Sequence, residues 1–269
     1  MAARPRHSES SASAPSSDRV RIAVVTGASS GIGAATAREL ARRGWRPLLV
    51  ARRRERLEQL AAELGGDYEV CDVADREDVD RAAEAILARH PRVDLLVNNA
   101  GIPGRGDFLS LEAERIEAVL RTNYLGGVWL VRALEPALQP GSHVVNVVSV
   151  AGTVAFAPAG PYAASKHAQL AFSRSLNGLM AARGVRVHTV LPGFVETEGF
   201  PQKTVLRSAL FRRTVIGPEL VAERIVNAVE SGKRELFVPR WYRIFSIGQA
   251  LLPGLAARLV ARAGYKRAR

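Results

Sequence analysis

The sequence predicts an α/β fold, a doubly wound sheet of about seven parallel strands with helices on both faces. Short apolar runs alternate along the chain with longer helical stretches. Most of these runs are apolar throughout, which is typical of strands that are covered on both faces. A glycine-rich turn follows the first run, as in nucleotide-binding domains. A chain of 269 residues with 47% hydrophobic content can bury one such core.

Seven segments are strand candidates, and the segments between them are long enough for helical crossovers, so we expect the strands to run parallel. Ligands of such sheets bind beyond the carboxyl ends of the strands. The candidates are IAVV (22–25), PLLV (47–50), YEVCDV (68–73), VDLLVNN (93–99), HVVNVVS (143–149), VRVHTVLPG (185–193) and ELFVP (235–239).

The chain divides into three parts. Residues 1–19 are rich in Ser, Ala and Pro and have no apolar run for a signal peptide, so we expect a disordered tail. A transit peptide is the weaker interpretation, because Glu9 and Asp18 interrupt its basic pattern. Residues 20–240 form the expected domain, and 241–269 a basic amphipathic helical extension.

Composition narrows the classes of function. The formal net charge of +12, with 34 arginines and 4 lysines, suits nucleic acid, an anionic membrane or the coding bias of a G+C-rich genome. No helix-turn-helix, zinc site or aromatic and basic sheet face is visible, so we expect no nucleic-acid binding. The single Cys71 excludes an internal disulfide, and the histidines lack metal-ligand spacing. We therefore expect no metal and a cytoplasmic location.

The turn after the first strand, TGASSGIG (26–33), predicts a nucleotide site. Glycines let such a turn close and let the backbone approach a diphosphate, which the following helix N-terminus attracts. A plain glycine-rich turn is the alternative. The predicted nucleotide contacts here are Gly27, Ser29, Ser30, Gly31, Ile32 and Gly33.

Arginines follow the second strand, where a dinucleotide fold commonly places an acid for the ribose hydroxyls. Arg52, the first choice, or Arg53 could instead bind a 2′-phosphate, which favours NADP(H) over NAD(H). Exposure on a helix surface is the alternative, and we favour it for Arg54 and Arg56. Asp72 and Val73, after the third strand, are candidates for adenine contact, although Asp there commonly caps a helix.

Seven motifs in register resemble the short-chain dehydrogenase/reductase family, over roughly residues 20–240. They are TGASSGIG (26–33), CDV (71–73), NNAG (98–101), Asn123, Ser149, YAASK (162–166) and LPG (191–193). The resemblance implies a single Rossmann-fold domain. It also implies that Thr26 and Asn98 hold the fold around the cofactor. The implied cofactor contacts are Asn99, Ala100, Gly101, Pro192, Gly193, Val195 and Thr197.

Tyr162 and Lys166 lie four residues apart, so on a helix they project from the same face. An ammonium group within a few ångströms would favour the phenolate and lower the pKa of the tyrosine. Alone, such a pair is more often a solvated helix face. Ser149, at the end of an apolar strand, and Asn123, a poor helix former inside a predicted helix, favour the catalytic interpretation.

These four residues predict the interconversion of a carbonyl and an alcohol. Tyr162 would donate a proton to the carbonyl oxygen that Ser149 orients, while NADPH supplies hydride. The resemblance implies that Lys166 also binds the nicotinamide ribose and that Asn123 positions a water. A non-catalytic nucleotide-binding regulator is the alternative, but it would be expected to have lost Ser149, Tyr162 or Lys166.

The chain after Gly193 is where the substrate would be selected. Five apolar residues suggest an apolar pocket for a lipid-like or steroid-like substrate, although simple core packing would explain them equally well: Phe194, Phe200, Val205, Leu206 and Leu210. In the extension, one helix face would carry Trp241, Ile244, Phe245, Ile247, Leu251 and Leu252, and the other Tyr242 and Arg243. This face could contact a membrane surface peripherally, or it could dock on the domain or across a homo-oligomer and frame the substrate entrance.

Overall fold

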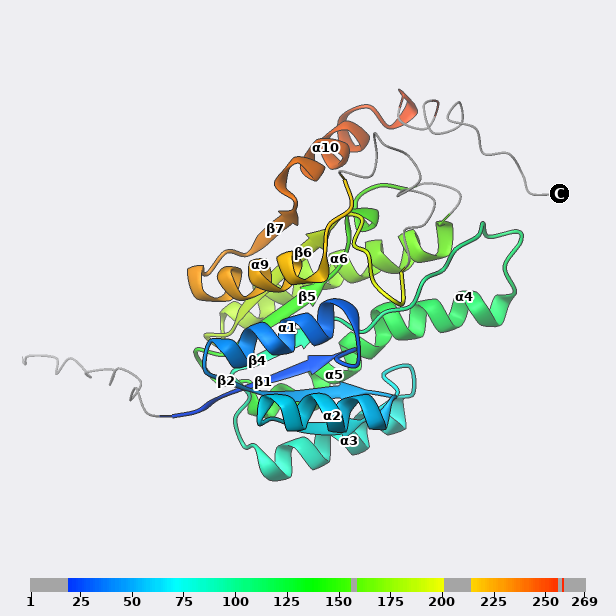
Figure 1. Cartoon of the computed structure of the whole chain (residues 1–269). Helices are drawn as coiled ribbons and strands as arrows, with labels where there is room; N and C mark the ends of the chain where they lie inside the picture. Colours follow the sequence, from blue (N-terminus) through cyan, green and yellow to red (C-terminus); the bar gives the residue numbers. More distant parts are fainter. Residues whose placement is uncertain (1–18, 156–158, 201–213, 256–257, 259–269) are drawn as a thin grey trace, which may run out of the picture.

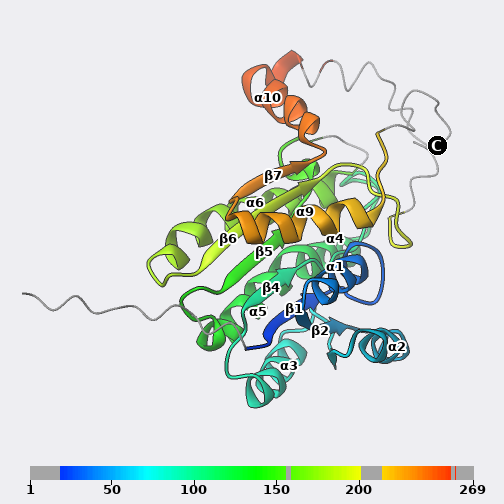
Figure 2. The ribbon, with the colours of Figure 1, turned by 60° about the vertical axis from the view of Figure 1, so that its left-hand side comes forward.

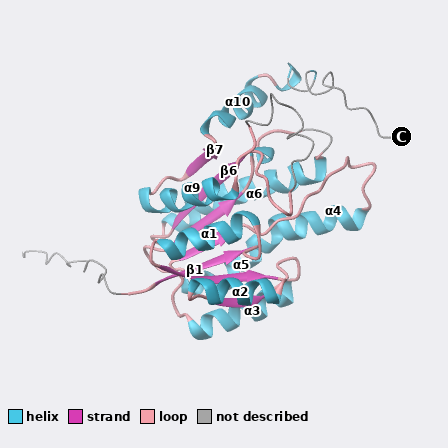
Figure 3. Cartoon of the chain, viewed as in Figure 1, coloured by secondary structure: helices cyan, strands magenta, loops and turns pink. Residues whose placement is uncertain are grey.

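The computed structural model describes residues 19–155, 159–200, 214–255 and 258. Its centre is a seven-stranded sheet in the order β3-β2-β1-β4-β5-β6-β7, in which every neighbouring pair is parallel (Figure 1; Figure 3). The predicted α/β fold is therefore confirmed. The strands are β1 (Arg21–Thr26), β2 (Trp45–Ala51), β3 (Asp67–Val70), β4 (Leu95–Asn98), β5 (His143–Val147), β6 (Arg186–Pro192) and β7 (Glu235–Val238).

Helices cover both faces of this sheet, as Figure 2 shows. Buried residues of α1 (Gly31–Arg42), α2 (Arg54–Leu64) and α9 (Pro218–Ser231) form one core cluster with the sheet. Buried residues of α3 (Arg76–Arg89), α5 (Gly126–Leu134) and α6 (Gly160–Ala181) form the other. A short helix, α4 (Ala113–Leu120), precedes α5.

The central strands are apolar on both sides because each side meets a helix layer. In β1, Ala23 and Val25 belong to the cluster of α1, α2 and α9, whereas Val24 between them belongs to the cluster of α3, α5 and α6. Successive side chains of a strand point to opposite faces, so neither face of β1 can be polar. This packing explains the continuous apolar runs of the sequence.

A chain of buried polar side chains crosses the core beneath the carboxyl ends of the strands. Asn98 Nδ2 donates to Asn146 Oδ1 at 3.0 Å, and Asn146 Nδ2 donates to Ser173 Oγ at 2.9 Å. The Ser173 hydroxyl lies 2.7 Å from Thr189 Oγ1. The chain therefore joins β4, β5 and β6 to α6. Directional hydrogen bonds of this kind fix the position of α6 along the sheet.

The C-terminal extension departs from the predicted division of its two faces. A short 3₁₀ turn, Arg240–Tyr242, leads into α10 (Arg243–Leu251), which projects beyond β7 in Figures 1 and 2. Tyr242, expected on the polar face, is only 3% exposed. The expectation was wrong because the helix begins after Tyr242, whose hydroxyl donates to Thr214 O and accepts a weak hydrogen bond from Phe194 N.

None of the described helices is long and apolar enough to cross a lipid bilayer. Arg19, which we assigned to the tail, donates to both carboxylate oxygens of Asp94, at 3.0 and 2.5 Å. Residues 1–18 of the predicted tail, the pocket candidates Val205, Leu206 and Leu210, and 259–269 of the extension lie outside the described residues.

Candidate active site

The predicted site residues gather beyond the carboxyl ends of β1, β4, β5 and β6. Strand order reverses between β1 and β4, because β1 pairs with β2 on one side and with β4 on the other. The connections that follow two such adjacent strands run to opposite faces of the sheet, which opens a crevice beyond the strand ends. The glycine turn follows β1, and Ser149 follows β5 by two residues.

The glycine turn has a backbone that other residues would not adopt. Gly27 and Gly31 have positive φ angles of 64° and 56°. At Gly33 a side chain is excluded by close packing, since a Cβ there would lie 2.3 Å from Gly27 O. The turn is fixed to the neighbouring strand as well: Thr26 Oγ1 accepts from Asn99 N at 2.9 Å and from Ala100 N at 3.0 Å. Thr26 therefore holds the segment Asn99–Gly101 beside the turn.

This arrangement fits a dinucleotide. The turn leads into α1, and no side chain caps the N-terminus of that helix. Anions are stabilised at such an N-terminus, where backbone N–H groups point outward. The bare glycines leave room for a diphosphate to approach these groups. Ser29, Ser30 and Ile32 belong to the same turn, as the sequence predicts.

Arg53, rather than Arg52, lies against the glycine turn. Arg53 donates to Ser29 Oγ at 3.0 and 2.9 Å and to Ser30 Oγ at 2.7 Å. Arg52 is more exposed and forms an ion pair of 3.6 Å with Asp72. Both predicted nucleotide-site arginines therefore make contacts there, Arg53 with the glycine turn and Arg52 with the predicted adenine contact Asp72.

Asp72 and Val73 lie at the start of the segment between β3 and α3. Asp72 Oδ1 accepts from Ala74 N at 3.0 Å, as in a local turn. Val73 is buried, and a Cβ added to Gly126 would lie only 2.5 Å from the Val73 carbonyl oxygen. The helix cap that the sequence offered as the alternative to adenine contact is Asp75, whose side chain accepts from Glu77 N and Asp78 N. Asp72 instead closes a local turn, and its carboxylate is paired with Arg52.

Tyr162 and Ser149 face each other in the crevice. Burial raises the pKa of Tyr162 to about 12, and a hydrogen bond with Ser149 opposes that shift. Ser149 Oγ also accepts from Ala151 N at 3.1 Å and makes a weak hydrogen bond to Pro192 O at 3.4 Å. The serine hydroxyl is therefore held between the tyrosine and the last residue of β6.

Lys166 lies one turn of α6 beyond Tyr162 and is 3% exposed. Its Nζ donates to Val147 O at 3.1 Å and to Gln169 Oε1 at 2.8 Å, and lies 5.8 Å from the centroid of the Tyr162 ring. Burial lowers the pKa of Lys166 to about 7. The expected lowering of the tyrosine pKa by Lys166 is not found, because burial raises the pKa of Tyr162 and only the hydrogen bond with Ser149 opposes that shift.

Asn123 lies in a π-helical turn, Arg121–Leu125, between α4 and α5. Its Oδ1 accepts from Ile102 N at 2.7 Å, and its Nδ2 donates to Ile102 O at 3.1 Å and to Ser165 Oγ at 3.0 Å. Ser165 Oγ in turn donates to Tyr162 O at 2.7 Å. Asn123 therefore connects the segment after β4 with the turn of α6 that carries Tyr162, and π turns are frequent at functional sites.

The segment after β6 closes over the glycine turn. A Cβ at Gly31 would lie 3.1 Å from Thr197 Cβ, and Val195 forms a bridge with Ile216. Gly193 meets the buried Tyr242, because a Cβ there would lie 2.3 Å from the tyrosine ring. Pro192 ends β6, and Gly193, Val195 and Thr197 lie on the segment that reaches the glycine turn.

Sequence reasoning missed three polar partners in this region: Gln169, Ser165 and Glu198. Gln169 lies three residues after Lys166, and Ser165 lies three residues after Tyr162. Residues at this spacing are neighbours on a helix, so the sequence could have indicated both. Glu198 contacts Arg53 and Arg56, more than 140 residues away in sequence, so no local pattern could reveal it.

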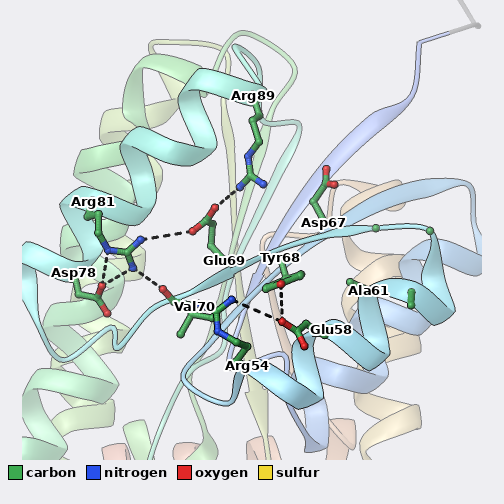
Figure 4. Close-up of a pocket in the computed structure, with 13 residues that line it drawn as sticks. Arg54, Glu58, Ala61, Asp67, Tyr68, Glu69, Val70, Asp78, Arg81 and Arg89 are labelled. Carbon is green, nitrogen blue, oxygen red and sulfur yellow. Dashed lines mark hydrogen bonds and ion pairs between the residues drawn. The ribbon is translucent and has the colours of Figure 1, made fainter.

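A cavity of about 830 Å³ lies elsewhere, along the outer edge of β3 between α2 and α3. Figure 4 shows its charged side chains paired with each other: Arg89 donates to Glu69 at 2.5 Å, Arg81 to Asp78 at 2.5 Å and to Val70 O at 2.6 Å. Charged side chains commonly cover an edge strand in this way. None of the predicted site residues lines this cavity.

Comparison with known proteins agrees with this geometry. The profile of the family described as short chain dehydrogenase matches residues 21–205. A protein of Streptomyces violaceoruber, named as a ketoacyl reductase of the granaticin polyketide synthase, is 37% identical over 224 residues, which cover 79% of this chain and 80% of that protein.

Two solved structures extend the comparison. An actinorhodin polyketide ketoreductase variant with NADPH has a TM-score of 0.73 and 30% identity, covering 81% of this chain and 95% of that one. A short-chain dehydrogenase/reductase of Burkholderia phymatum in complex with NAD has a TM-score of 0.73 and 25% identity, covering 86% and 95%. The chain therefore belongs to the short-chain dehydrogenase/reductase family and is an NAD(P)-dependent oxidoreductase.

Proposed function

We propose that the protein interconverts a carbonyl and an alcohol on an apolar substrate, with NADP(H) preferred over NAD(H). The observation that carries this proposal is the group of Ser149, Tyr162 and Lys166 at one end of the sheet. A hydrogen bond links the tyrosine to the serine, and the lysine is buried one helical turn away. Ser149 and the uncapped N-terminus of α1 both follow the carboxyl ends of parallel strands of the same sheet.

The nucleotide would lie across the glycine turn, with its diphosphate at the N-terminus of α1. Arg53 and Arg52 would hold a 2′-phosphate, because a guanidinium matches phosphate oxygens bidentately. The hydroxyls of Ser29 and Ser30, which lie within 3.0 Å of Arg53 nitrogens, support a polar phosphate site there. Asn99, Ala100, Gly101, Pro192, Gly193, Val195 and Thr197 would border the remainder of the nucleotide.

The bound nicotinamide supplies or accepts the hydride. Tyr162 donates its phenolic proton to the carbonyl oxygen during reduction, and the raised pKa keeps that proton in place at neutral pH. Ser149 holds the same oxygen by a hydrogen bond and so orients the carbonyl. The protonated form of Lys166 has three donors: two bond Val147 O and Gln169, and the third is left for a ribose hydroxyl. Asn123 acts on the position of α6 through Ser165 and could hold a water beside it.

The aromatic ring of Phe200, beside Tyr162, supports an apolar substrate. The centroids of these two rings are 5.6 Å apart, and Phe194, on the same segment, is 39% exposed. An apolar group next to the reacting carbonyl would bury against the Phe200 ring and gain free energy from leaving water. The other predicted pocket residues, Val205, Leu206 and Leu210, lie outside the described part of the chain.

The decisive variant is Tyr162→Phe, which removes the proton donor and keeps the ring. We expect turnover of a medium-chain ketone with NADPH to fall by about 100- to 10,000-fold. The dissociation constant for NADPH, measured by nicotinamide fluorescence, should change less than twofold. Tyr68→Phe, which removes an exposed hydroxyl bonded to Glu58, is the matched control and should retain wild-type turnover. Near wild-type turnover in Tyr162→Phe would refute the assignment.

We also propose that the exposed apolar side chains of the extension contact an anionic membrane surface. We call these side chains the α10 apolar surface, and each is between 46% and 73% exposed. The sequence after Glu235 has seven basic and no acidic residues. Basic charge beside apolar side chains is typical of helices that lie in a lipid interface. The residues of the α10 apolar surface are Trp241, Ile244, Phe245, Ile247, Leu251, Leu252 and Leu255.

The test is flotation with phosphatidylglycerol-containing vesicles and with phosphatidylcholine vesicles. Wild-type protein should float with the anionic vesicles, and the double variant Ile244→Glu with Leu251→Glu should not. Leu179→Glu, at an exposed leucine of α6, controls for the added charge. If the double variant instead leaves flotation unchanged and alters the oligomeric state, the surface contacts a second subunit and the membrane proposal is refuted.

A further inference from the structure

Glu198 joins the segment after β6 to the arginines that follow β2. Its Oε1 accepts from Arg53 Nη1 at 3.0 Å, and its Oε2 accepts from Arg56 Nη1 at 2.5 Å. The hydrogen bond from Arg56 lowers the pKa of Glu198, with the charge of Arg53 adding to the effect. The carboxylate is therefore a charged anion that both guanidinium groups hold.

This carboxylate lies where a 2′-phosphate could meet the same arginines. Arg53 also donates to Ser29 and Ser30, so Glu198 lies beside the glycine turn that would hold the nucleotide. Its neighbour Thr197 packs directly on Gly31 of that turn. In dinucleotide folds the group that follows the second strand contacts the 2′ position of the adenosine ribose. Carboxylates and phosphates accept hydrogen bonds from arginine in the same bidentate manner.

We propose that Glu198 competes with the 2′-phosphate for Arg53 and Arg56, and so determines how strongly the protein prefers NADP(H). This inference rests on the proposed function of the crevice. Arg56, which the sequence analysis assigned to an exposed helix surface, then belongs to the cofactor-selecting group. In the nucleotide-free protein Glu198 neutralises the two arginines. Binding of NADP(H) breaks two ion pairs and forms new ones to phosphate, whereas NAD(H) leaves Glu198 in place.

The effect of this competition on NADPH affinity is large enough to measure. In both ion pairs the side chains are partly exposed: 40% for Arg53, 46% for Arg56 and 54% for Glu198. Pairs of this kind contribute little individually, because water and salt screen them. A variant without the Glu198 charge has no such pairs to break when NADPH binds, so its affinity for NADPH should be about three- to tenfold higher.

The test compares nucleotide affinities of wild-type protein and Glu198→Gln, which keeps the shape and removes the charge. Isothermal titration should give a dissociation constant for NADPH about three- to tenfold lower in the variant, and a constant for NADH within twofold of wild type. The difference should shrink in high salt, because screening weakens the ion pairs. Glu55→Gln, at an exposed acid in the first turn of α2, is the control for loss of a nearby negative charge.

Two results would overturn the inference while the protein still binds nucleotide. Equal changes for NADPH and NADH in Glu198→Gln would mean that Glu198 acts on the whole crevice and does not compete with the 2′-phosphate. An equal gain in Glu55→Gln would mean that the effect is one of net charge. Failure of the wild-type protein to bind either nucleotide is a different outcome, since it refutes the proposed function itself.

Discussion

At the scale of single residues, burial outweighs charge in the proposed catalytic group. The Lys166 ammonium donates to Val147 O and Gln169, and burial raises the pKa of Tyr162 to about 12. The sequence identified both residues by their spacing. It could not predict these pKa values, because desolvation depends on side chains that other elements bring to α6.

The ionisation of Tyr162 can be measured directly. A raised pKa means that the phenol keeps its proton as pH rises from about 7 to about 10. The ultraviolet difference spectrum between wild-type protein and Tyr162→Phe should therefore show no phenolate signal over that range in the nucleotide-free protein. Carbonyl reduction, which uses the phenol, should tolerate alkaline pH, and alcohol oxidation, which uses the phenolate, should accelerate with pH. A phenolate signal with a midpoint below about pH 9 would contradict this assignment.

At the scale of elements, the sequence predicted what depends on local pattern. All seven strands were predicted from runs bounded by turns, and the five central ones lie between the two helix layers. The edge strands β3 and β7 are only partly buried. The glycine turn was likewise identified from its local pattern. The π turn at Asn123 and the burial of Tyr242 were not predicted, because both depend on partners distant in sequence, Ile102 and Thr214. Fold class follows from periodicity, whereas these details follow from tertiary contacts.

The glycine turn gives a prediction at this scale. In Gly33→Ala the new methyl group would meet Gly27 O at 2.3 Å and Asn99 Nδ2 at 2.7 Å. Such overpacking should lower the free energy of unfolding by about 1–3 kcal/mol and weaken nucleotide binding at least tenfold. Urea titration and nucleotide fluorescence measure the two effects.

Gly178→Ala is the matched control, because Gly178 also lies in a helix but has no neighbour within 4 Å of an added Cβ. Here we expect a gain of about 0.5–1 kcal/mol from the higher helix propensity of alanine, with unchanged nucleotide binding. Equal effects of the two substitutions would show that close contact in the glycine turn is unimportant.

At the scale of the whole molecule, stability depends on a buried histidine pair between β5 and β6. His143 Nδ1 lies 2.9 Å from His188 Nε2, and His188 Nδ1 lies 2.7 Å from Lys233 O. Since a carbonyl only accepts, His188 carries its proton on Nδ1, and His143 donates to His188 Nε2. Burial lowers the pKa of His143 to about 4, with the charges of His188 and Arg186 adding to the effect.

The unfolding free energy should therefore depend on pH. The unfolded chain binds a proton at His143 near pH 6.5, but the folded protein does so only near 4, so the contribution of this residue is complete above about 6.5. As pH falls from about 6.5 to about 5, the urea midpoint should decrease. His143→Gln should flatten this slope, and His167→Gln, at an exposed histidine of α6, should not. An unchanged slope in His143→Gln would assign the pH dependence to other groups.

The buried polar chain from Asn98 through Asn146 and Ser173 to Thr189 affects how such a protein can diverge. This chain of hydrogen bonds to three strands holds α6, the helix that carries Tyr162, so its position does not depend on the proposed substrate pocket alone. Substitutions in that pocket, around Phe200, then need not displace Tyr162. We therefore expect directed evolution toward other substrates to begin there, with Thr197 and Glu198 kept because they border the proposed cofactor site.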